Sequence, residues 1–261
     1  MAIDLNTKQI IAVLQEVWST DNMALAIRAK DEGATVLEYR VDLVGGTLAD
    51  HEHNLAGLRC AGLPMLLTIR SEQEGGNFKV KDQDQERLAM FEALLPLVDA
   101  VDIELSSVSI RKHVIELARD AGKFSVASVH NFSATPSMDA METFAEDAAE
   151  LGADVVKMAF MPQSKRDVET LSAFTHRYKK LPLVTMSMGE LGAPSRVINL
   201  LLGSRFTYGF VGSRPAAPGQ IKINEIVKEL AAFEGQPVTL EQAKHYMAAY
   251  WARRHIAEPS H

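Results

Sequence analysis

The chain has 261 residues, 47% of them hydrophobic and 23% charged, a composition typical of globular proteins. A net charge of −7 provides no basic field for nucleic acid or for an anionic membrane, and we expect neither as a partner. Cys60 is the only cysteine, which excludes an intrachain disulfide and a multi-cysteine metal site and fits a reducing cytoplasm. We expect Cys60 to be a small buried side chain.

The N-terminal residues 1–8 lack the basic and apolar segments of a signal peptide. No apolar run approaches the roughly 20 residues that span a bilayer. The sequence therefore predicts a cytoplasmic protein without a membrane segment.

Eight short apolar runs alternate with eight longer segments in which apolar residues recur at helical spacing. The predicted strands are 10–14, 35–42, 64–70, 100–105, 124–130, 154–160, 181–188 and 206–211. The predicted helices are 21–32, 48–60, 82–97, 107–120, 138–151, 164–178, 195–202 and 220–233. Continuous rather than alternating hydrophobicity in the strands favours a parallel sheet that helices cover.

The closed form of eight such units is a (β/α)8 barrel, which we predict as a single α/β domain over residues 1–261. A further C-terminal helix is predicted over 240–254, with Tyr250 and Trp251 packing on the barrel or on a partner chain. An open doubly wound sheet is the alternative. It is disfavoured because no Gly-x-Gly-x-x-Gly turn follows the first strand and no Walker-type loop is present.

Lys157 interrupts the apolar sixth strand. A buried ammonium must pair with a carboxylate, reach solvent, or lose its proton and become a nucleophilic amine. A neutral amine can condense with a ketone to form an iminium, which acts as an electron sink. From this strand alone, a structural ion pair and a catalytic nucleophile are equally open.

Other polar residues lie where predicted strands end, which is where barrel enzymes build their sites. Glu38, Arg40 and Asp42 would share one face of the second strand by its two-residue period. His130 ends the fifth strand, so an imidazole that titrates near neutrality would lie beside Lys157.

Three arginines, Arg40, Arg70 and Arg196, would supply bidentate donors for a substrate with carboxylate and hydroxyl groups. A purely structural charge ring that includes Glu38 and Glu104 is the alternative, which the lysine and histidine together disfavour. The histidines show no metal-ligand spacing, and we expect no metal. The Gly- and Pro-rich segment 212–220 is expected to close over a ligand.

Taken in order, these features resemble the type I 3-dehydroquinate dehydratase family, the Schiff-base enzymes of the shikimate pathway, over nearly the full length. The residues that carry the resemblance are Glu38-Tyr39-Arg40-Val41-Asp42, Thr68-Ile69-Arg70, Glu74-Gly75-Gly76, Asp102-Ile103-Glu104-Leu105, Ser128-Val129-His130-Asn131-Phe132, Val156-Lys157, Met186-Ser187-Met188-Gly189, Ser195-Arg196 and Ala217-Pro218-Gly219-Gln220.

The resemblance implies dehydration of 3-dehydroquinate to 3-dehydroshikimate without a metal or an organic cofactor. Lys157 would form an imine with the C3 ketone, and His130 would remove a C2 proton and later protonate the departing C1 hydroxyl. Glu74 would orient the histidine.

The resemblance also implies a substrate-binding set and a homodimer. That set is Glu38, Arg40, Arg70, Arg196, Ala216 and Gln220. Arg196 would pair with the substrate carboxylate, and Gln220 would lie on a lid. Ala216 stands where some relatives place a serine, which would cost one hydroxyl contact and affect binding more than chemistry.

Two rival functions remain. A Schiff-base aldolase on the same barrel would also use a lysine of strand six, but it would need a phosphate site near strands seven and eight, where this chain has Ser195 and Arg196. A non-catalytic barrel would keep the charges for recognition alone.

Overall fold

The computed structural model describes residues 3–14, 22–79, 84–234 and 236–258. Eight strands form one sheet in the order β7-β6-β5-β4-β3-β2-β1-β8, and all neighbouring strands in this order run parallel. The strands are β1 (Gln9–Leu14), β2 (Val36–Arg40), β3 (Met65–Thr68), β4 (Ala100–Glu104), β5 (Phe124–Asn131), β6 (Val155–Phe160), β7 (Leu183–Ser187) and β8 (Phe206–Phe210). Because the last strand pairs with the first, the sheet is a (β/α)8 barrel and not the open alternative.

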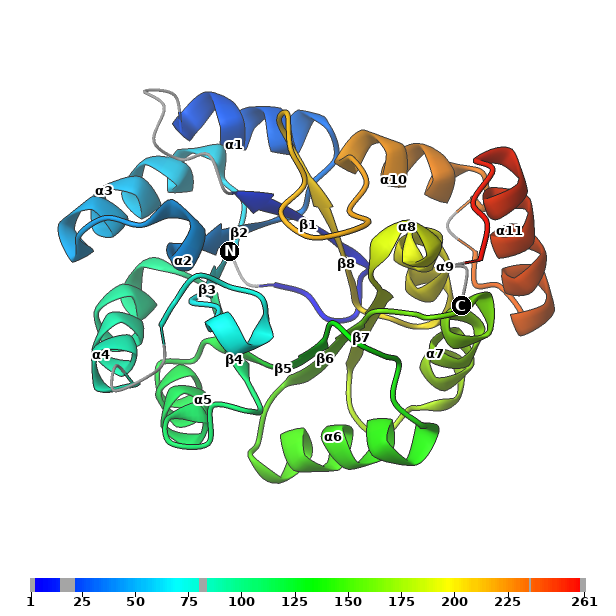
Figure 1. Cartoon of the computed structure of the whole chain (residues 1–261). Coiled ribbons are helices and arrows are strands. Elements are labelled where there is room, and N and C mark those ends of the chain that lie inside the picture. Colours follow the sequence, from blue (N-terminus) through cyan, green and yellow to red (C-terminus); the bar gives the residue numbers. More distant parts are fainter. Residues whose placement is uncertain (1–2, 15–21, 80–83, 235, 259–261) are drawn as a thin grey trace.

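Helices surround the strands on all sides (Figure 1). The α-helices are α1 (Asn22–Asp31), α2 (Val41–Val44), α3 (Leu48–Leu58), α4 (Asp84–Leu94), α5 (Arg111–Asp120), α6 (Met138–Glu150), α7 (Lys165–Arg177), α8 (Gly189–Gly192), α9 (Ser195–Leu202), α10 (Ile223–Ala231) and α11 (Leu240–Arg253). Three 3-10 turns are η1 (Arg59–Ala61), η2 (Glu72–Glu74) and η3 (Leu95–Leu97). Every helix in the described residues is too short or too polar to span a membrane.

The seam between β7 and β8 is closed by a short segment rather than by a strand ladder. The Arg205 backbone N–H donates to the carbonyl of Leu183 with an N···O distance of 2.8 Å. The buried Ser204 hydroxyl accepts from the Thr185 N–H at 3.2 Å and donates to the Phe206 carbonyl at 2.9 Å. These bonds satisfy strand-edge groups that would otherwise be buried without partners.

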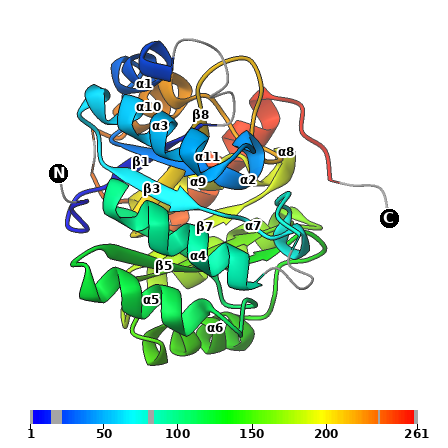
Figure 2. The ribbon, with the colours of Figure 1, turned by 90° about the vertical axis from the view of Figure 1, so that its left-hand side faces the viewer.

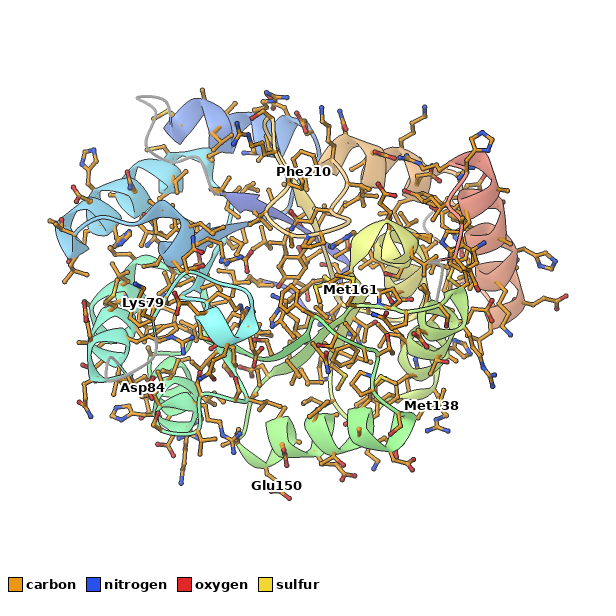
Figure 3. All side chains as sticks on the ribbon, viewed as in Figure 1. Lys79, Asp84, Met138, Glu150, Met161 and Phe210 are labelled. Carbon is orange, nitrogen blue, oxygen red and sulfur yellow. The ribbon has the colours of Figure 1, made fainter. Side chains whose placement is uncertain are left out.

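Side chains fill both the barrel interior and the space between the barrel and its helices (Figure 3). Six strands are buried at every position, which is the burial expected for a parallel sheet that is covered on both faces. The loops and turns at the carboxyl ends of the strands carry polar groups. Figure 2 shows α2 and α8 at one end of the barrel, the end toward which these strands run.

The C-terminal helix α11 lies on the outside of the barrel, as predicted. A capping box of Thr239 and Gln242 starts it, and Tyr250 and Trp251 are buried against α7 and α9. The Trp251 indole N–H donates to the Leu191 carbonyl at 2.9 Å. The apolar face of this helix is therefore used within the chain, which removes it as a surface for a partner.

Three sequence predictions were wrong in detail. β2 ends at Arg40, and Asp42 belongs to the single turn α2, so Asp42 does not share a strand face with Glu38 and Arg40. Cys60 is exposed rather than buried, because it lies in η1 at the surface. The predicted helices over 107–120 and 220–233 begin only at Arg111 and Ile223, after turns. Positions 21, 82 and 83 of two other predicted helices lie outside the described residues.

Candidate active site

All nine site residues proposed from the sequence line one pocket at the carboxyl ends of the strands. They are Glu38, Arg40, Arg70, Glu74, His130, Lys157, Arg196, Ala216 and Gln220. Strands β2, β5 and β6 contribute four of them directly. Arg70 and Glu74 (in η2) follow β3, Arg196 lies in α9 after β7, and Ala216 and Gln220 lie in the loop after β8. The pocket is completed by Phe132, Met186, Met188 and Tyr208, whose side chains give it apolar walls.

Lys157 is buried in the middle of β6, and its amine is paired. The Nζ atom lies 2.9 Å from Asp102 Oδ2 and 3.9 Å from Glu38 Oε1. It also lies 4.3 Å from the centre of the Tyr208 ring, a cation–π contact. A buried lysine can pair with a carboxylate, reach solvent or lose its proton, and the structure contains the ion pair. Lys157 also lines the pocket.

Asp102 links Lys157 to Arg70. The Arg70 guanidinium donates to Asp102 Oδ1 at 2.8 Å and to the Ser128 hydroxyl at 2.8 Å, and it lies 3.1 Å from Glu104 Oε1. Burial opposes ionisation of Asp102, but Arg70 and Lys157 outweigh it and hold the pKa of this carboxyl well below its usual range. Asp102 is therefore ionised, and its carboxylate pairs with two cations, Arg70 and Lys157.

The charged chain continues through the barrel wall to α4. Glu104 Oε1 accepts from the Ser71 N–H at 2.9 Å, and Glu104 Oε2 pairs with the fully buried Arg87. Arg87 also donates to the Ile69 carbonyl and to the Ser107 hydroxyl at 2.8 Å. Positive and negative groups thus alternate from Arg87 to Lys157.

Glu74 holds His130 by two contacts. Its Oε2 accepts from the His130 backbone N–H at 2.9 Å and lies 2.9 Å from ring atom Nδ1. Burial lowers the pKa of His130 well below its ordinary value, and Arg70 and Lys157 lower it further. The imidazole is therefore neutral near pH 7, and a proton on Nδ1 directed at Glu74 leaves Nε2 free as a base.

Arg40 and Arg70 differ from the prediction that they offer bidentate donors to a ligand. Arg40 gives its own bidentate pair to Asp42, at 2.8 and 2.7 Å. The two terminal nitrogens of Arg70 are bound to Asp102 and Ser128. Both arginines therefore organise carboxylates around the pocket, and only part of Arg40 remains for a ligand.

Arg196 is a buried cation that no carboxylate of the described residues pairs with. Its donors go to the carbonyls of Gly219 at 2.9 Å, Tyr208 at 3.1 Å and Pro218 at 3.3 Å. Burial lowers its pKa to about 10, so the guanidinium stays protonated at neutral pH. An uncompensated buried cation in a pocket is a binding site for an anion.

The loop after β8 is held closed by short-range bonds. The Gln220 side-chain oxygen accepts from the Ala216 N–H at 2.7 Å, and the Pro218 carbonyl accepts from the Gly189 N–H at 3.2 Å. Gly219 has φ +71°, and a Cβ there would lie 2.0 Å from the Gly189 carbonyl oxygen. The loop packs on Gly189 at the start of α8 only because Gly219 lacks a side chain.

Sequence reasoning did not assign roles to four groups of this site. Asp102 and Tyr208 contact the lysine amine, Ser106 contacts Glu74, and Asp42 fixes Arg40. Asp102 had a signal, since it shares a strand with Glu104 near the strand's carboxyl end. Tyr208 had none, because an aromatic residue in a strand is ordinarily a core residue.

The fold and the site define a (β/α)8-barrel enzyme with a buried amine and an oriented imidazole in one pocket at the barrel mouth. Comparison with known proteins makes this class specific, because the family model for Type I 3-dehydroquinase matches residues 14–237. The chain belongs to the type I 3-dehydroquinase family.

Individual relatives agree with this family. A 3-dehydroquinate dehydratase of Methanosarcina barkeri is 39% identical over 242 residues, which cover 89% of this chain and 98% of the relative. Among solved structures, type I 3-dehydroquinate dehydratase of Clostridium difficile has a TM-score of 0.79 at 28% identity, covering 88% of this chain and 93% of that one. The 3-dehydroquinate dehydratase of Aquifex aeolicus has a TM-score of 0.75 at 31% identity, with coverages of 86% and 98%.

Proposed function

We propose that this enzyme dehydrates 3-dehydroquinate to 3-dehydroshikimate through an imine on Lys157, with His130 as base and then acid. The names of its relatives supply the substrate. The single observation that carries the mechanism is that the Lys157 amine and the His130 ring, held by Glu74, line the same buried pocket. This pairing favours a Schiff-base dehydratase over a non-catalytic barrel.

Imine formation begins with loss of a proton from the Lys157 ammonium. Asp102 is a poor acceptor because Arg70 holds its pKa low, so neutral His130 is the base at hand. The free amine adds to the C3 ketone to give a carbinolamine. His130 returns its proton to the carbinolamine hydroxyl, which leaves as water, so that an iminium forms and the imidazole is neutral again. The Tyr208 ring beside the nitrogen stabilises this positive charge.

Elimination follows from the acidity that the iminium gives to C2. His130 takes a C2 proton and the electron pair moves into an enamine. The electrons then return to expel the C1 hydroxyl, which leaves as water with the proton from His130. Hydrolysis of the new iminium releases the conjugated ketone and restores the lysine.

Substrate orientation is assigned by charge. Arg196 takes the carboxylate because it is the buried cation without an anionic partner among the described residues. Glu38, the free part of Arg40 and Gln220 bind hydroxyls, and Arg70 acts through Asp102. Ala216 contributes its backbone to the lid rather than a hydroxyl to the substrate.

Borohydride reduction in the presence of 3-dehydroquinate tests the proposal. We expect a covalent adduct that peptide mapping places on Lys157, together with the absorbance of the enone product. Lys157→Ala should abolish turnover and the adduct. His130→Ala should still form the adduct, more slowly because solvent must take the lysine proton, but should lose turnover by a factor of about 100 to 10,000. Lys180→Ala, at an exposed lysine paired with Glu146, is the matched control.

Each outcome has a distinct meaning. Enone without an adduct would point to elimination through an enolate and remove the nucleophile role of Lys157. Near wild-type turnover by Lys157→Ala would do the same. Absence of both signals in the unaltered enzyme would overturn the substrate assignment.

We also infer from the family resemblance a homodimer that works in the cytoplasm. Light scattering after size-exclusion chromatography tests the first expectation, and a mass of one chain would contradict it. Cell fractionation tests the second.

A further inference from the structure

Ser106, in the turn after β4, fixes the second oxygen of Glu74. Its hydroxyl donates to Glu74 Oε1, while Glu74 Oε2 is the oxygen that faces the N–H and ring of His130. Each oxygen of this carboxylate therefore has its own partner, and the rotation of the carboxylate is set from both sides.

The turn that presents Ser106 is held by its own hydrogen bonds. The Ser106 carbonyl accepts from the Val108 N–H at 2.9 Å. The neighbouring Ser107 side chain is buried, donates to Glu104 at 3.0 Å and accepts from Arg87 at 2.8 Å. Ser107 anchors the turn in the barrel wall, and Ser106, which is exposed, reaches toward Glu74.

We propose that Ser106 is a positioning residue for the dehydration, holding Glu74 so that its other oxygen keeps the His130 ring with a proton on Nδ1 and with Nε2 free. This inference rests on the proposed function of His130 as the base. Ser106 does not act on the substrate; it acts through the carboxylate and the imidazole.

The charges around the pair give this role a pH signature. Arg70, Glu104 and His130 face Glu74, while Arg40, Arg70, Asp102 and Lys157 face His130. Burial raises the pKa of Glu74 to about 7, against the opposing effects of Arg70, the Ser106 hydroxyl and the His130 N–H. Without the hydroxyl, a larger fraction of Glu74 is protonated near neutrality and no longer accepts from Nδ1.

The experiment is a pH profile of kcat/KM for Ser106→Ala and Ser106→Thr. We expect Ser106→Ala to lose about tenfold at pH 6 and less than about threefold at pH 9, since one hydrogen bond to a carboxylate is removed. Ser106→Thr keeps the hydroxyl and should restore the profile. Ser109→Ala is the matched control, because this exposed serine of the same loop bonds to Asp84 instead.

A second measurement is independent of turnover. In histidine-labelled enzyme without substrate, nitrogen NMR should show the Nδ1–H form of the His130 ring at pH 7 in the unaltered enzyme and a smaller share of it in Ser106→Ala. A Ser106→Ala enzyme with the unaltered profile and the unaltered tautomer would overturn the proposal. Absence of enone formation in the unaltered enzyme would instead contradict the proposed function, and the NMR comparison would still decide the role of Ser106.

Discussion

Lys157 of β6 is paired in this structure with a carboxylate that lies two strands away in the sheet. Its amine pairs with Asp102 of β4, and Asp102 is in turn held by Arg70. The sequence predicted a buried lysine beside a histidine, because both lie on apolar strands. It left an ion pair open but could not name Asp102 as the partner, since that depends on side-chain directions across the barrel interior rather than on local pattern.

Glu74 is expected to set the acid side of the activity profile. Its pKa of about 7 exceeds the ordinary value, so the carboxylate form is lost as pH falls through about 7, and kcat/KM should fall with it. His130 has a pKa well below its ordinary value and should not contribute in this range.

Glu74→Gln should therefore abolish the fall of kcat/KM near pH 7. It should also lower kcat by about 100-fold, because an amide cannot hold the imidazole as an anion does. Kinetics between pH 5 and 9 measure both effects. If kcat/KM of Glu74→Gln still falls as the pH drops through about 7, the fall belongs to the titration of another group.

At the scale of elements, the loop after β8, which we propose as the lid, is held by contact between two backbones. Gly219 lies so close to the Gly189 backbone that no side chain fits at position 219, and Arg196 donates to the carbonyls of Pro218 and Gly219. The composition of segment 212–220 predicted a mobile cover. Its docking on α8 was not predictable, because α8 is a single turn without a periodic pattern.

Gly219→Ala should open the lid. The added methyl group would meet the Gly189 carbonyl oxygen at 2.0 Å, and we expect kcat/KM to fall by about tenfold or more as Gln220 leaves the pocket. Gly45→Ala is the matched control: its φ of +64° is similar, so it carries the same backbone strain of about 1 kcal/mol, but nothing lies within 4 Å of the new Cβ. Equal losses in the two variants would attribute the effect to strain alone.

At the scale of the whole molecule, the regular alternation of strand and helix was sufficient to predict the barrel. Strands that are buried at every position can lie only in a sheet with both faces covered. The closure at β7 and β8 was not predictable, because it rests on the loop residues Ser204 and Arg205 rather than on a strand pattern. The ends of β2 and β3 were also misplaced, since polar residues continue past each strand into a turn.

Ser204→Ala should weaken the closed barrel. It removes a buried hydroxyl and leaves the Thr185 N–H and the Phe206 carbonyl without that partner, so we expect a loss of about 1–3 kcal/mol in the free energy of unfolding. Urea denaturation measures this loss, with the exposed Ser133→Ala as control. Unchanged stability would mean that the Arg205–Leu183 bond alone holds the seam.

Cys60 has a practical consequence. It is the sole thiol of the chain, it is exposed, and η1 leads into the amino end of β3, so it lies at the opposite end of the barrel from the pocket. A maleimide dye or a surface linker would therefore attach at one defined point and leave the mouth of the barrel facing solution. Immobilised enzyme oriented in this way should retain its full turnover.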